Sequence, residues 1–168
     1  MLKQASILGA ALLLGGCATA FYDARTAGPM LEQAAKLPPA SLRAHSSCSL
    51  AFATTGATKA DFTPGACAYT DTALYLYSWD QTTRQYRREI QLDFAGLKGI
   101  SKAKQGLWTQ LQTPVDGGQI VFEPNKSADA VHELLRKAGV KDLPSSGYVS
   151  INAPPQPQTI YIPVYVGN

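Results

Sequence analysis

The fold is decided by a stretch that begins CAYTDTALYLYSWDQTTRQYRREIQLDF (residues 67–94) and continues to Gly139. Its pattern is that of short strands separated by turn residues and followed by one amphipathic helix. Residues 86–94 alternate most clearly, with Ile90, Leu92 and Phe94 on one face and charged or amide side chains on the other. Such alternation is typical of a half-buried strand.

Seven strands and one helix follow from the whole pattern. The predicted strands cover residues 48–53, 66–70, 73–79, 86–94, 97–104, 107–113 and 119–122. Leu107 and Leu111 are expected to point inward from the sixth strand, and the hairpin signal Asp116-Gly117 separates the sixth strand from the seventh. The helix is predicted from apolar residues at helical spacing between Ala128 and Ala138.

The ends of this helix have recognisable signals. Ser127 is a suitable N-cap, and Gly139 is a natural left-handed stop after which Val140 can pack back on Leu135. His132 falls on the polar side of the helix and is expected to be solvated.

This order of elements resembles the pleckstrin-homology superfold, and in particular its bacterial PH-like and GRAM-like members, over residues 48–140. The resemblance is carried by the hairpin of residues 67–77, the strand of residues 89–93 leading to Leu97 and Ile100, and the closing helix. It implies a mostly β (α+β) fold, a seven-stranded bent sheet or partly open barrel capped by one C-terminal helix. A lipocalin-like barrel is the alternative.

The N-terminus carries an export signal. Lys3 and the short apolar run 7–14 are typical of a signal peptide over residues 1–16, and the run is too short to span a bilayer. It ends in Leu14-Gly15-Gly16-Cys17, which resembles the bacterial lipobox. The resemblance implies cleavage before Cys17 and acylation of that residue, as with palmitate. The alternative is an ordinary signal peptide with a chance cysteine.

Localisation follows from the same resemblance. Ala18 after the cysteine implies the outer membrane of a Gram-negative cell, with the protein facing the periplasm, or the plasma membrane of a Gram-positive host. The two other cysteines, Cys48 and Cys67, would then form a disulfide in an oxidising compartment. This bond would close a loop of about 20 residues, worth about 3 kcal/mol on the chain-entropy model. A metal-binding or catalytic thiol is the alternative, although the spacing does not match zinc sites.

The flanking segments have separate interpretations. Residues 17–47 are predicted to be a stem that contains a short helix beginning near Pro29. In the alternative interpretation, this helix packs on the domain. His45 is expected to be a solvated loop residue. Residues 141–168 form a proline-rich tail whose alternating stretch 159–166 should pair with a sheet edge, within the chain or on a partner.

Composition and motifs give little support for catalysis. The net charge is +3 with no basic run, so nucleic-acid binding is not indicated. The sequence shows no phosphate loop, paired carboxylates, nucleophile elbow or metal-ligand cluster. We therefore expect no catalytic residues, no metal and no cofactor.

A binding surface is easier to propose. Tyr75, Tyr77 and Trp79 share one face of a strand, and the basic residues Arg84, Arg87 and Arg88 follow closely. Aromatic residues dominate interface energetics. The alternative is that both faces of this strand are buried, one of them by the stem or the tail. Lys98, Lys102 and Lys104 alternate along another strand and, with the arginines, are either solvated or close to anionic headgroups.

Three functions are compatible with these observations. The first is a membrane-anchored envelope lipoprotein whose periplasmic domain is a non-enzymatic protein-binding or scaffold module with another envelope protein as its partner. The second is a carrier or sensor of a small apolar or anionic ligand in a β-barrel cavity. The third is a hydrolase with a site assembled from residues that the sequence does not group.

Overall fold

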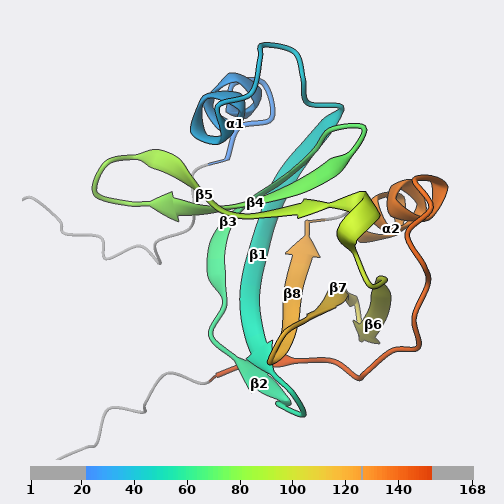
Figure 1. The fold of residues 1–168 in the computed structure, drawn as a ribbon. Coiled ribbons are helices and arrows are strands. Elements are labelled where there is room, and N and C mark those ends of the chain that lie inside the picture. Colours follow the sequence, from blue (N-terminus) through green and yellow to red (C-terminus); the bar gives the residue numbers. More distant parts are fainter. Residues whose placement is uncertain (1–21, 126, 153–168) are drawn as a thin grey trace, which may run out of the picture.

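Seven antiparallel strands form one sheet in the computed structural model, which describes residues 22–125 and 127–152 (Figure 1). The strand order is β5-β4-β3-β1-β8-β7-β6, so that β5 and β6 are the two edges and do not pair with each other. The strands are β1 (Ala44–Thr54), β3 (Thr63–Tyr69), β4 (Ala73–Asp80), β5 (Gln85–Asp93), β6 (Ser101–Gln105), β7 (Trp108–Val115) and β8 (Gly118–Pro124). The predicted seven strands and mostly β class are confirmed, and the described sheet is not closed into a barrel.

β1 bends the sheet into two halves. Its first residues, from Ala44, pair only with β3, and its last residues, to Thr54, pair only with β8. Only Cys48 to Leu50 pair on both sides. The strand is therefore longer than the predicted 48–53. Its additional residues allow it to pair with β3 in one half of the sheet and with β8 in the other.

The main core fills the space between these halves. It contains Leu50, Leu74 and Leu76 from one half and Leu111 and Phe122 from the other. The helix α2 (Ala128–Lys137) closes one end of this space with Val131 and Leu135. Packing of this kind is the chief source of stability in a domain of this size.

The predicted stop of α2 is confirmed. Gly139 has φ +87°, and the amide of Val140 donates to the carbonyl of Leu135 at 3.0 Å. Val140 is buried in the same cluster as Leu135. A residue in the left-handed region allows the chain to turn back and satisfy the last carbonyl groups of the helix.

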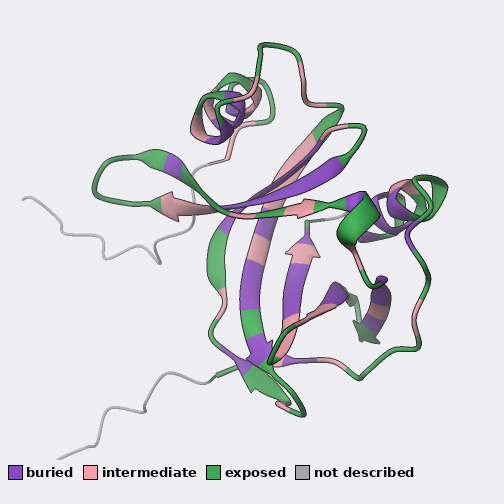
Figure 2. Cartoon of the chain, in the orientation of Figure 1, coloured by how far each residue is buried: buried purple, intermediate pink, exposed green. Residues whose placement is uncertain are grey.

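A second helix, α1 (Ala27–Ala35), covers the other face of β3–β5 (Figure 2). Its buried stripe of Ala27, Leu31 and Ala35 packs against alanines of β3 and tyrosines of β4 and β5. Of the two interpretations of residues 17–47, the packed helix is therefore the one that holds for residues 27–35. The small residues of the stripe let the helix approach the sheet closely.

The predicted disulfide is present between Cys48 of β1 and Cys67 of β3, with a Cα–Cα distance of 5.5 Å. Both cysteines are buried in the main core. The bond therefore joins two neighbouring strands beside the point where β1 bends.

The chain after α2 crosses the β6–β8 half of the sheet as an extended strap. Buried amides hold it, because Gln110 Nε2 donates to the carbonyl of Val149 at 2.6 Å and Gln112 Nε2 donates to that of Gly147 at 2.7 Å. The strap ends in β9 (Ser150–Ile151), which pairs in parallel with β2 (Lys59–Ala60). The stretch 159–166, which was expected to pair with a sheet edge, lies outside the described residues.

The predicted strand 97–104 starts later than expected. A 3-10 helix, η1 (Phe94–Gly96), follows β5, and β6 begins at Ser101. Within residues 22–125 and 127–152, no helix has the length and apolar character needed to cross a bilayer.

Candidate functional site

The expected aromatic surface is only partly exposed. Tyr75 and Tyr77 have exposed fractions of 5% and 0%, because α1 lies over them. The alternative, in which both faces of this strand are buried, therefore holds for these two tyrosines, and their place in an open binding surface is wrong. Burial also raises the pKa of the Tyr77 hydroxyl above its usual value.

The β4–β5 hairpin that follows these tyrosines extends beyond the body of the sheet (Figure 1). Residues 80–85 and 87–89 are exposed. Trp79 and Tyr86 meet edge to face one strand pair before the turn of the hairpin, with ring centroids 4.9 Å apart. Burial raises the pKa of Tyr86 to about 12. The aromatic pair therefore stiffens a hairpin whose outer part is in solvent.

A β-bulge at this hairpin changes the expected alternation of β5. Tyr77 pairs with Arg88 and Leu76 with Ile90, so Glu89 is the extra residue. A bulge shifts the faces of the strand by one residue. Tyr86 thus packs on the α1 side, whereas Ile90 contacts the main core. Alternation alone placed both even-numbered residues on one face, and it missed the bulge.

The three predicted arginines are exposed on this hairpin, but their contacts differ. Arg87 donates from Nε to the Glu89 carboxylate at 2.9 Å, and Arg88 donates to the Gln91 side chain at 3.2 Å. Hydrogen bonds from Ser78 and Arg87 lower the pKa of Glu89. Arg84 has no ion pair with any described residue.

Arg84 is also held in an unusual conformation. Its φ of +52° lies in the left-handed region, which is favourable for glycine and costs other residues about 1 kcal/mol. The preceding turn is ordered by Asp80, whose carboxylate accepts hydrogen bonds from the amides of Thr82 and Thr83 at 2.8 and 3.1 Å. These bonds lower the pKa of Asp80. The turn thus presents a cation where glycine would fit better.

A second exposed feature lies at the other edge of the sheet, in the turn between β6 and β7. Leu107, predicted to point inward, is 100% exposed, whereas Leu111 is fully buried as expected. The reason is the register, because Gln105 pairs with Trp108 and leaves Gly106 and Leu107 as the two turn residues. Trp108 is 66% exposed. This apolar turn was not predicted, although Gly106 beside Leu107 and Trp108 indicates it in the sequence.

An open groove of about 1090 Å³ lies beside this turn. Its walls come from the β6–β7 turn, the first half of β1, the end of β8 and the start of α2. Tyr22, the first described residue, also lines it. The lining includes Ser46, Ser47, Leu107, Trp108 and Glu123, so the groove combines small polar and exposed apolar side chains.

The lysines near this edge are partly paired. Lys102 donates to the Asp129 carboxylate at 2.8 Å, and Lys98 to that of Asp116 at 3.0 Å. The hydrogen bond from Lys102 lowers the pKa of Asp129, and the charge of Lys104 lowers it further. Lys104 itself is exposed on β6.

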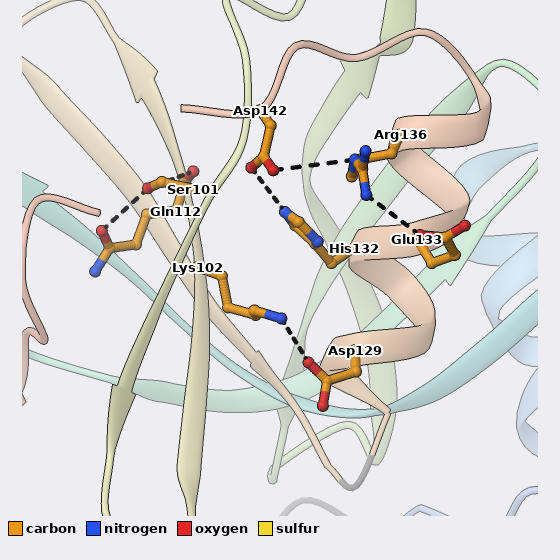
Figure 3. A network of polar contacts seen from close by, with 8 residues as sticks. All are labelled: Ser101, Lys102, Gln112, Asp129, His132, Glu133, Arg136 and Asp142. Carbon is orange, nitrogen blue, oxygen red and sulfur yellow. Dashed lines mark hydrogen bonds and ion pairs between the residues drawn. The ribbon is translucent and has the colours of Figure 1, made fainter. Parts of the chain in front are cut away.

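Both histidines differ from expectation. His45 is a half-buried residue of β1 rather than a loop residue, and the Tyr22 hydroxyl lies 2.8 Å from its Nδ1. Burial lowers the pKa of His45. His132 is buried instead of solvated, because the strap after α2 brings Asp142 within 3.1 Å of its Nε2 (Figure 3).

The His132–Asp142 pair belongs to a network that fastens the strap to α2. Arg136 contacts Asp142 at 3.9 Å and Glu133 at 3.7 Å, as Figure 3 shows. Within the described chain, the hydrogen bond of the His132 imidazole reaches Asp142. The described residues contain no group of three or more metal-ligating side chains. Cys17 lies outside the described residues.

No family model matches this sequence, and no curated protein matches it. Among solved structures, the chain is similar to the C-terminal domain of an unknown protein from Leishmania infantum, with 15% identity and a TM-score of 0.40. That match covers 58% of this chain and 82% of the other. A structure of Vav1 inhibited by an allosteric inhibitor matches with 9% identity, a TM-score of 0.39, and coverage of 58% of this chain and 26% of that chain.

Proposed function

We propose that the chain is an exported lipoprotein of the bacterial envelope, anchored through Cys17, whose PH-like domain binds another envelope protein without enzymatic activity. The lipobox-like Leu14-Gly15-Gly16-Cys17 supports the anchor, and the disulfide is typical of an oxidising compartment. The strand order and the helix after β8 support the PH-like interpretation.

The observation that carries the binding role is the basic tip of the β4–β5 hairpin. Arg84 occupies a left-handed position that favours glycine, on an exposed turn that extends from the sheet. Lys36 and Ala40 also have positive φ, but they lie at or after the end of α1, whereas Arg84 lies on the extended hairpin. Backbone strain at an exposed position is a reason to look for function there. The neighbouring carboxylates are engaged, Asp80 with turn amides and Glu89 with Arg87. Arg84 and Arg88 therefore remain as donors for a partner surface that presents carboxylates.

The packing favours this role over that of a small-ligand carrier. A carrier needs an enclosed cavity, whereas leucine and phenylalanine side chains fill the space between the two halves of the sheet. The groove beside β1 is open to solvent and lies at the surface.

The binding role is tested by crosslinking in cells, followed by mass spectrometry of the captured proteins. Arg84→Gly should abolish capture of the dominant partner while leaving the free energy of unfolding within about 1 kcal/mol of the wild type, since glycine relieves the strained φ. Lys36→Gly is the matched control. Lys36 is exposed, has φ +57° and carries the same charge, but it lies at the end of α1.

Capture that survives Arg84→Gly and the double variant with Arg88→Gln would show that the hairpin is not the binding surface. Loss of capture in both glycine variants would indicate a general effect of charge and would also contradict the proposal. The anchor is tested separately, because Cys17→Ser should abolish acyl labelling, and normal labelling of that variant would refute the lipobox interpretation.

A further inference from the structure

The β6–β7 turn carries the most exposed apolar surface of the described chain. Four large hydrophobic side chains are exposed among the described residues of the chain, and two of them, Leu107 and Trp108, are adjacent. Gly106, with φ +58°, allows the two-residue turn that directs them away from the core. Single exposed hydrophobic residues are common, but an adjacent leucine and tryptophan at the tip of a hairpin call for an apolar partner.

The position of this turn relative to the N-terminus identifies that partner. Tyr22 lines the same groove as Leu107 and Trp108. Cys17 precedes Tyr22 by so few residues that the connecting chain reaches at most about 17 Å. A lipid attached to Cys17 would therefore hold the membrane surface within reach of the turn.

We propose that Leu107 and Trp108 insert into the membrane that holds the acylated Cys17, and so fix the orientation of the domain on the lipid surface. This inference rests on the proposed lipid anchor. Tryptophan is enriched at the membrane–water interface, where its ring lies at the level of the headgroups. Insertion of a leucine beside it buries apolar surface.

The charges around the turn suit a lipid surface. Lys104 is exposed near the end of β6, one strand pair before the turn that carries Leu107. Its ammonium group can therefore meet anionic headgroups. Two carboxylates line the groove beside the turn: Asp129 accepts a hydrogen bond from the cation of Lys102, and Glu123 accepts from the neutral side chains of Gln110 and Tyr148.

Tryptophan fluorescence tests the insertion directly. The full-length acylated protein is reconstituted into phosphatidylethanolamine–phosphatidylglycerol vesicles, with and without brominated acyl chains. In the Trp79→Phe variant, which keeps Trp108 as its reporter, brominated lipid should reduce the emission roughly twofold or more. The matched Trp108→Phe variant reports from Trp79, which packs on Tyr86, and its emission should stay unchanged. Adding Leu107→Asp should restore much of the Trp108 emission, because a carboxylate resists insertion.

Each failure has a distinct meaning. If intact mass shows no acyl group on Cys17, the anchor is wrong and the insertion falls with it. If the protein is acylated and floats with the vesicles but Trp108 is not quenched, only the insertion is wrong. If Trp108 is unquenched in vesicles yet shielded from iodide in native membranes, a protein covers the turn and the lipid proposal is refuted.

Discussion

Replacing Leu31 with alanine should destabilise the whole domain, because α1 is an integral part of its packing. Leu31 lies on the buried face of α1, is fully buried, and belongs to the same cluster as the tyrosines of β4. The truncation removes roughly 2.4 kcal/mol of transfer free energy at about 0.8 kcal/mol per methylene. The cavity left under a rigid helix raises the expected loss of unfolding free energy to about 3 kcal/mol. For a chain of this size, the midpoint of thermal unfolding should fall by about 6–12 °C.

The measurement is equilibrium urea unfolding of the full chain, followed by tryptophan fluorescence. Gln33→Ala is the matched control, because Gln33 is exposed on the same helix and its truncation should change stability by less than about 0.5 kcal/mol. If Leu31→Ala were as mild as Gln33→Ala, α1 would not be packed on the sheet in solution. The burial of Tyr75 and Tyr77 would then have no explanation, and the original expectation of an aromatic surface would return.

Three further outcomes are expected. Replacing both Cys48 and Cys67 with alanine should lower the free energy of unfolding by about 3 kcal/mol in urea, and free thiols in protein isolated without reductant would contradict the bond. Burial lowers the pKa of His45 in the folded state, so the unfolded chain binds a proton more readily, and the free energy of unfolding should fall as the pH drops below about 6.5. In a His45→Gln variant, the melting temperature should depend less on pH over this range than it does in the wild type. Gly65→Ala should prevent proper pairing of β3 with β4, because its Cβ would overlap the carbonyl oxygen of Tyr77, and unaltered circular dichroism with an unchanged melting temperature would disprove this contact.

The sequence predicts the number of strands well because local signals define them. The turn residues at Asp116-Gly117 and the helical spacing before Gly139 act within a few residues, and the structure confirms both. The pairing of Cys48 with Cys67 was also accessible, since the sequence has three cysteines and the proposed acylation of Cys17 would leave only these two.

The burial of particular side chains was less accessible because it depends on distant segments. His132 has a polar position on its own helix, and it becomes buried only when the strap brings Asp142 to it. Tyr75 and Tyr77 have an alternating pattern compatible with an exposed face, and α1, about 40 residues earlier, covers that face. Leu107 shows the opposite error, because a register that places it in the turn overrides its hydrophobicity.

The packing of α1 also changes how the two proposals fit together. Residues 17–47 were predicted to be a stem, but helix α1 and the start of β1 occupy much of that range. If Cys17 is acylated as proposed, few residues separate the anchor from Tyr22, so the domain would be kept close to the lipid surface. The β6–β7 turn and the β4–β5 hairpin lie toward opposite edges of the strand order. A domain oriented by Leu107 and Trp108 would thus leave Arg84 available to a partner, and Leu107→Asp should weaken partner capture in cells without altering the hairpin itself.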